Sequence, residues 1–157
     1  MMFGSPNSLR VVTFQLATDP AAETIGSRWT GTPTQATFRF SFGSATAAVN
    51  VPDVWTSFCE LYLQSQLAAR DKLQALCLGG QRRFTLTNVK GIIVCQWSRE
   101  HIFAVRKSEL VSSIETLVDR FLEDMPETLR EAFVQLGASM IRNDPMFAPL
   151  NELEGAR

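Results

Sequence analysis

Histidine and cysteine are scarce in this sequence. Its 157 residues include one histidine, His101, and three cysteines at positions 59, 77 and 95. None of these residues has the CxxC or HxxxH spacing typical of metal ligands, and an odd number of separated cysteines does not indicate a disulfide framework. We therefore expect no metal site, and reduced thiols such as an intracellular protein contains.

One histidine also leaves little material for catalysis, because a nucleophile needs a base within hydrogen-bonding reach. The pair to consider is Cys95 and His101. If residues 92–97 and 102–107 pair around a two-residue turn, Cys95 lies opposite Ala104, and His101 lies about three residues farther along the sheet. A buried cysteine and a turn histidine are the simpler interpretation, so we expect no catalytic residue.

The glycine-rich signatures of nucleotide binding, GxGxxG and GxxxxGK[ST], are absent. Gly79 and Gly80 follow a predicted helix and would end it, whereas a phosphate-binding loop precedes its helix. The first ten residues lack the apolar segment of a signal peptide, and no apolar run approaches the roughly 20 residues of a membrane span. We expect a soluble, intracellular protein without a cofactor and without membrane insertion.

Charge is balanced over the whole chain but not along it. The formal net charge is −1, which gives no general reason to expect a nucleic acid or a membrane as partner. Residues 81–107 carry six basic side chains and one acidic one, whereas residues 108–157 carry four basic and ten acidic ones. The basic side chains of the first block are Arg82, Arg83, Lys90, Arg99, Arg106 and Lys107. Together with nearby aromatic residues they suggest a basic patch, and basic turns that face the acidic helices or water are the alternative.

Alternation of apolar and polar residues predicts the first strands. Residues 9–17 alternate as a half-buried strand does. Residues 35–51, QATFRFSFGSATAAVNV, predict a hairpin whose Gly43-Ser44 turn has the glycine-first order of type II′. This register puts three phenylalanines on one face, opposite small residues: Phe38 with Val49, Phe40 with Ala47 and Phe42 with Ala45.

Residues 82–107 predict a meander of three strands. Asn88 and Gly91 suit a type I turn closed by a bulge between the first two strands. The segment IIVCQW is apolar on both faces, as a central strand covered on both sides should be.

Helical periodicity appears in three segments. The first covers residues 52–77 and ends before Gly79-Gly80. The second begins at Ser108, and the third begins near Pro126 and ends near Asn143. The predicted fold is a single α+β domain over residues 1–157, in which an antiparallel sheet, formed by a hairpin and a three-stranded meander, packs against one long helix and two C-terminal helices. Residues 18–34 are expected to form a long loop and residues 144–157 an irregular tail.

The long helix carries more apolar surface than a sheet requires. Beside its broad stripe, a second stripe repeats at intervals of four residues, and it consists of Trp55, Cys59, Leu63 and Leu67. This stripe is either covered by residues 18–34 and the tail, or it is an interface with a partner.

The order of elements, carried by the stretch RFTLTNVKGIIVCQWSREHIFAVRKSELVSSIETLVDRFL, resembles the longin and roadblock group of profilin-like domains. That resemblance implies a five-stranded antiparallel sheet between one long helix and one or two C-terminal helices. It also implies a non-catalytic role, as a dimer or as a subunit of a regulatory assembly. Bacterial secretion chaperones, which are small α+β dimers, are a rival analogy.

Two hypotheses on function follow. The first is a non-catalytic protein–protein interaction module, such as an adaptor, a chaperone-like protein or a complex subunit, which forms a homodimer or a hetero-complex through the second apolar stripe. The alternative is a protein that binds nucleic acid or an acidic partner through the basic ends of the meander.

Overall fold

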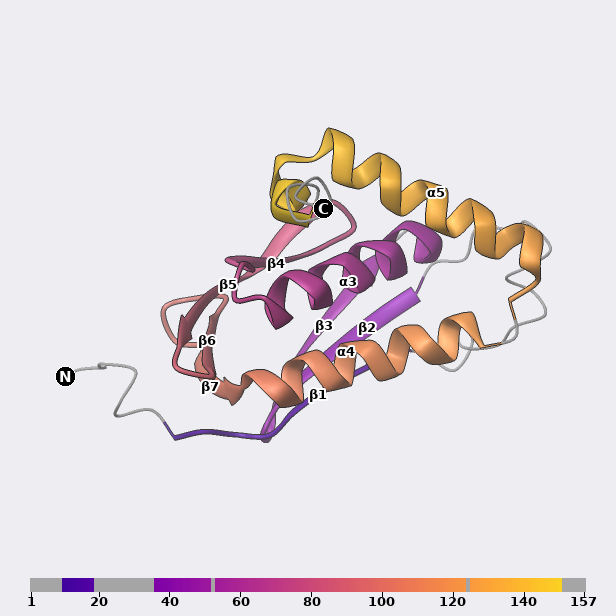
Figure 1. Cartoon of the computed structure of the whole chain (residues 1–157). Coiled ribbons are helices and arrows are strands. Elements are labelled where there is room, and N and C mark those ends of the chain that lie inside the picture. Colours follow the sequence, from indigo (N-terminus) through magenta and orange to yellow (C-terminus); the bar gives the residue numbers. More distant parts are fainter. Residues whose placement is uncertain (1–9, 19–35, 52, 124, 151–157) are drawn as a thin grey trace.

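A computed structural model describes residues 10–18, 36–51, 53–123 and 125–150, and the structural statements below concern these residues (Figure 1). Every strand pairing within its sheets is antiparallel. Three strands form one sheet in the order β1-β2-β3, and four form a second in the order β4-β5-β6-β7. The elements are β1 (Phe14–Thr18), β2 (Ala36–Phe42), β3 (Ala45–Val51), α3 (Val54–Ala69), β4 (Ala75–Leu78), β5 (Gln81–Val89), β6 (Ile92–Gln96), β7 (Ile102–Arg106), α4 (Lys107–Leu122), α5 (Glu127–Asn143) and the 3₁₀ helix η2 (Pro145–Phe147). The predicted α+β class, with antiparallel strands, one long helix and C-terminal helices, is confirmed, but the hairpin and the meander belong to two sheets instead of the single sheet predicted.

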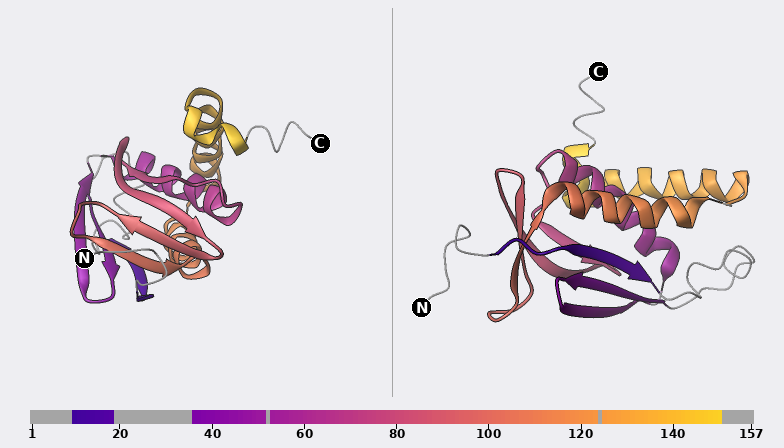
Figure 2. Two further views of the ribbon diagram at one scale, coloured as in Figure 1. Left: turned by 90° about the vertical axis from the view of Figure 1, so that its left-hand side faces the viewer. Right: turned by 90° about the horizontal axis from the view of Figure 1, so that it is seen from below.

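The helices form a layer on the strands. Figure 1 shows α3 between α4 and α5, and the right-hand view of Figure 2 shows β1 and β2 along the opposite side of the molecule from α5. A short parallel contact joins the two sheets, because Val11 bridges to Ala104 and the amide of Val12 donates to the carbonyl of Ala104 over 2.8 Å.

The β2–β3 hairpin supplies the aromatic centre of the core. Its predicted register is confirmed, with Phe42 opposite Ala45. Phe38 packs on Phe58 of α3 with ring centroids 5.4 Å apart, and Phe40 packs on Phe84 of β5 with centroids 4.8 Å apart. The inner face of the first sheet therefore packs against both α3 and the second sheet.

The long helix is shorter than the sequence predicts. It ends at Ala69, where Asp71 adopts a positive φ of 59°. The amide of Asp71 donates to the carbonyl of Ala68, and that of Lys72 to the carbonyl of Leu67, which is the Schellman pattern of a helix C-terminus. The prediction that the helix continues to residue 77 is wrong, because the left-handed residue that ends it is an aspartate rather than a glycine.

The residues beyond this point form an additional strand, β4. The prediction that Gly79 and Gly80 cap a helix is also wrong: they form the two-residue turn between β4 and β5, with φ of +66° and +79° as a type I′ turn requires. The carboxylate of Glu60 on α3 accepts the amides of both glycines, at 2.9 and 3.1 Å. Gln64, one turn farther along α3, bonds to both the amide and the carbonyl of Cys77.

Two details of the meander also differ from the prediction. Lys90 and Gly91 both have positive φ and connect paired residues Val89 and Ile92, so the turn is type I′ rather than type I with a bulge. Between β6 and β7 the turn spans five residues, Trp97 to His101, and the register is shifted by one position from the predicted one.

The predicted loop over residues 18–34 lies outside the described residues except for Thr18, which ends β1. Within the predicted irregular tail, Pro145–Phe147 form η2. Phe147 and Leu150 are both buried, so the described part of the tail contributes to the core.

Candidate functional site: a groove between three helices

The second apolar stripe of α3 lies inside the molecule. Cys59, Leu63 and Leu67 are 0%, 3% and 1% exposed. Trp55 is half-buried and meets Phe133 of α5 edge-on, with centroids 5.4 Å apart. The stripe proposed as a partner interface is therefore packed within the chain, and α5 forms part of its cover. The other predicted cover, residues 18–34, lies outside the described residues except for Thr18.

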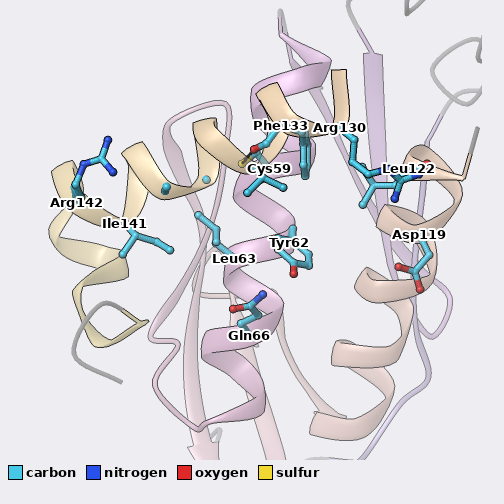
Figure 3. Close-up of a pocket in the computed structure, with 13 residues that line it drawn as sticks. Cys59, Tyr62, Leu63, Gln66, Asp119, Leu122, Arg130, Phe133, Ile141 and Arg142 are labelled. Atoms are coloured by element: carbon cyan, nitrogen blue, oxygen red, sulfur yellow. Dashed lines mark hydrogen bonds between the residues drawn. The ribbon is translucent and has the colours of Figure 1, made fainter. Parts of the chain in front are cut away.

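A groove remains beside this contact, where α3 forms the floor between α4 and α5 (Figure 3). Its volume is about 590 Å³. The floor consists of Cys59, Tyr62, Leu63 and Gln66, and α4 contributes Asp119 and Leu122. The other wall belongs to α5 and consists of Arg130, Phe133, Val134, Gly137, Ala138, Ile141 and Arg142.

Contacts of α5 with α3 and with the end of α4 fix the position of the groove wall. At Gly137 the α5 backbone lies so near α3 that an added Cβ would stand 3.6 Å from the Cys59 sulfur and 3.9 Å from Leu63. The guanidinium of Arg130 donates to the carbonyl of Leu122 over 2.9 Å and ties the start of α5 to the end of α4. Beyond Arg130, no residue of α5 forms a hydrogen bond to α4 among the described residues. The groove occupies the space between these two helices.

The groove exposes apolar side chains. Three large hydrophobic residues of the described chain are well exposed, and two of them, Tyr62 at 40% and Val134 at 65%, line this groove. Val134, Ala138 and Ile141 follow one another at intervals of four and three residues, so they share one side of α5. The sequence analysis placed the surplus apolar surface on the long helix and missed this stripe, although its spacing was a visible signal.

Two exposed charges of opposite sign lie at the two ends of the groove, and the third charged lining residue, Arg130, is half-buried and bonded to the carbonyl of Leu122. Figure 3 shows Asp119 of α4 and Arg142 of α5 on opposite sides of the pocket. Both side chains are exposed, and neither forms an ion pair with another residue that the structure describes. The groove is therefore apolar along its length and polar at its ends, which is the usual composition of a protein interface.

The thiols are not placed for nucleophilic chemistry. Burial raises the pKa of Cys59 and of Cys95 to about 12, which disfavours the reactive thiolate. Cys95 lies opposite Phe103 rather than Ala104, and the ring of His101 is bonded through Nδ1 to the Ser98 hydroxyl at 2.7 Å. The considered pair of Cys95 and His101 is thus not joined by a hydrogen bond in this structure. In the described ranges, no group of three or more histidine, cysteine or acidic side chains is arranged to hold a metal ion.

The six basic residues of the meander fall into two groups. Arg82, Arg83 and Arg99 surround a shallow hollow of about 370 Å³. The others lie toward the opposite end of the sheet: Lys90 in the β5–β6 turn, Arg106 at the end of β7, and Lys107, whose ammonium pairs with Asp71 at 2.9 Å. They do not form one continuous basic patch.

Comparison with known proteins gives no match to a protein-family model, to a curated protein or to a solved structure. The resemblance to longin and roadblock domains thus stays a prediction. Among the described helices, none has both the length and the apolar character that crossing a membrane requires.

Proposed function

We propose that this chain is a non-catalytic protein–protein interaction module that forms a homodimer through the groove between α3, α4 and α5. The observation that carries the proposal is the exposure of Tyr62 and Val134 in an apolar groove. Fully burying one side chain of valine size stabilises an association by about 1.5–3 kcal/mol, so such a groove favours a protein partner.

A second copy of the chain suits the charges at the two ends. If a two-fold axis lies in the plane of the groove mouth, at right angles to the line from Asp119 to Arg142, each carboxylate faces the guanidinium of the other copy. The two copies would then form two equivalent ion pairs around a shared apolar centre. A two-fold axis parallel to that line would set like charges against each other and is disfavoured.

Small residues on α5 support close packing in this arrangement. Ala138 is exposed beside Val134, so the backbone of a partner's α5 can approach this wall. The distance between packed helices is set by the side chains at their contact, and small ones permit the lower end of the usual range of about 8–10 Å.

Neighbouring residues of α5 provide a matched test. Val134 lines the groove, whereas Gln135 is equally part of the helix surface, is exposed, and does not line it. In sedimentation equilibrium, Val134→Glu should weaken dimerisation at least tenfold, because it puts a carboxylate into the apolar centre. Gln135→Glu introduces the same charge and should leave the association constant within about twofold. Equal effects of the two substitutions would exclude this groove as the interface.

Exchange of the two end charges tests the orientation of the copies. Asp119→Arg and Arg142→Asp should each weaken the dimer, because each creates like charges across the interface. The double variant restores opposite charges in both pairs and should recover most of the lost affinity. Additive losses in the double variant would contradict the proposed axis.

A further inference from the structure

Three arginines converge at one end of the second sheet. Arg82 and Arg83 follow Gln81, the first residue of β5, and Arg99 lies in the turn after β6, so three basic side chains line the hollow between them. None of these guanidinium groups forms an ion pair with an acidic side chain in the described ranges. Their charge is therefore available to a ligand.

A β-bulge places Arg82 on the solvent side, with the half-buried Arg83 beside it. Leu76 pairs with Phe84 and Cys77 pairs with Arg82, so Arg83 is the extra residue of β5. In a regular strand Arg82 would share the inner face with Phe84. The bulge interrupts this alternation, and Arg82 is exposed while Phe84 is 2% exposed.

Arg83 lines this hollow and carries one unsatisfied buried donor. Its Nε atom is closed off from solvent and has no hydrogen-bond partner among the described residues. Because no ligand can reach this buried atom, an anion in the hollow would bond to the terminal N–H groups of the guanidinium. The fork of N–H groups of a guanidinium fits phosphate and carboxylate oxygens with two parallel bonds.

Neither aromatic residue that lines the hollow is free to stack on a nucleobase, since Phe84 is buried and Trp97 is packed against other rings. The ring of Trp97 is stacked on His101, with centroids 4.6 Å apart and an interplanar angle of 11°. Phe84 meets the same ring edge-on at 5.3 Å, and Phe103 lies against it at 5.4 Å. Single-stranded nucleic acids depend on such stacking platforms, so the hollow favours a ligand held by its oxyanion alone.

The spacing of the positive charges also favours a small anionic group. Lys90 lies eight residues from Arg82, which is about 26 Å at roughly 3.3 Å per strand residue. A nucleic-acid backbone would need basic side chains along its path, whereas the three arginines lie around one point.

We propose that the hollow formed by Arg82, Arg83 and Arg99 binds a single phosphate-monoester dianion. Three guanidinium groups suit a group of charge close to −2 better than a singly charged carboxylate. This site is separate from the groove between the helices and does not depend on the homodimer.

Titration with inorganic phosphate, followed by NMR of the arginine Nε–H groups, tests the site. Phosphate at constant ionic strength should shift the Arg83 signal in a saturable manner, and chloride should not. Arg83→Gln and Arg99→Gln should each weaken phosphate binding at least tenfold. Binding to the Arg83→Gln variant is followed through the Arg99 signal, and binding to the Arg99→Gln variant through the Arg83 signal. Arg99 is an exposed turn residue, so its replacement leaves the fold intact. Arg106→Gln is the matched control at the other end of the sheet and should change the affinity less than twofold.

Absence of a saturable shift, or equal weakening by Arg106→Gln, would overturn the proposal. Oligothymidine without a terminal phosphate is the nucleic-acid probe. If it binds more tightly than inorganic phosphate, and both Lys90→Gln and Arg83→Gln abolish its binding, the proposal is overturned in favour of nucleic acid. Titrations with a phosphoserine peptide and with glycerol phosphate then distinguish the source of the group, and preference for either one supports the site.

Discussion

Two helices of almost equal length, α3 and α5, are buried to very different degrees. Eleven of the 16 residues of α3 are buried, but only Phe133 and Gly137 are buried among the 17 residues of α5. α3 belongs to the core because the strands, α4 and α5 pack around it, and it buries polar as well as apolar side chains. The outer helix covers one face of the inner one and still exposes apolar side chains such as Val134, which is why we propose that a partner binds at α5.

The same contrast holds for polar residues. α3 buries the side chains of Glu60 and Gln64, and both are satisfied by backbone groups of the β4–β5 hairpin. Acidic and basic residues of α5, such as Glu131 and Arg142, are exposed. Changes in α3 should therefore affect folding, and changes on the outer side of α5 should affect association. The stability measurements below use the Val134→Glu background, because dimerisation would make stability depend on concentration.

The largest difference is expected between two leucines. Leu63 of α3 is 3% exposed, whereas Leu136 of α5 is only partly buried. Leu63→Ala removes fully packed methyl groups and should lower the free energy of unfolding by about 2–5 kcal/mol. Leu136→Ala should cost less than half as much in the same urea titration. Equal losses would mean that α5 is as much a core element as α3.

Gly137 sets the distance between the two helices. Gly137→Leu should lower the free energy of unfolding by about 1–3 kcal/mol, because atoms beyond Cβ have no space beside Cys59 and Leu63. Gly137→Ala should instead raise it by about 0.5–1 kcal/mol, since the added Cβ makes ordinary contacts at 3.6 and 3.9 Å and alanine favours a helix. Thermal unfolding of the two variants checks the opposite signs, and a loss with alanine would show that the helices are closer than described.

The smallest effect concerns the buried carboxylate of α3. Burial raises the pKa of Glu60 above its ordinary value of 4.5, against the lowering effect of the Gly79 and Gly80 amides. As pH rises above 4.5, the unfolded chain loses this proton before the folded chain does, so stability should fall until pH passes the folded-state pKa. Glu60→Gln should remove this fall, although its amide leaves one glycine N–H without an acceptor.

Urea titrations at several pH values measure this dependence. Glu115→Gln, on the exposed surface of α4, is the control and should retain the fall. A Glu60→Gln variant with the same pH profile as the parent would show that this carboxylate ionises equally easily in both states.

Much of the fold was predictable because its signals are local. The Gly43-Ser44 turn fixes the register of β2 and β3, and the apolar period of α4 and α5 is regular. The end of α3 was not predictable in the same way, since Asp71 provides the left-handed conformation that glycine usually provides. Leu73 and Leu76 also continue the helical stripe into β4, so periodicity alone could not separate helix from strand there.

The candidate site was predictable only in part. The sequence indicates correctly that α3 has surplus apolar surface, but it does not tell which element covers that surface. The covering helix, α5, carries its own second stripe of Val134, Ala138 and Ile141, and only the position of α5 relative to α4 turns this stripe into a groove. Likewise, strand pairing puts the basic residues at two opposite ends of the second sheet instead of in one patch.

The solution mass of the native chain tests the central claim most directly. Light scattering over a series of protein concentrations should give a mass that rises toward twice 17.5 kDa, and Val134→Glu should remain near 17.5 kDa over the same range. A native chain that stays at 17.5 kDa at every concentration would contradict the homodimer and would leave a different protein as the occupant of the groove.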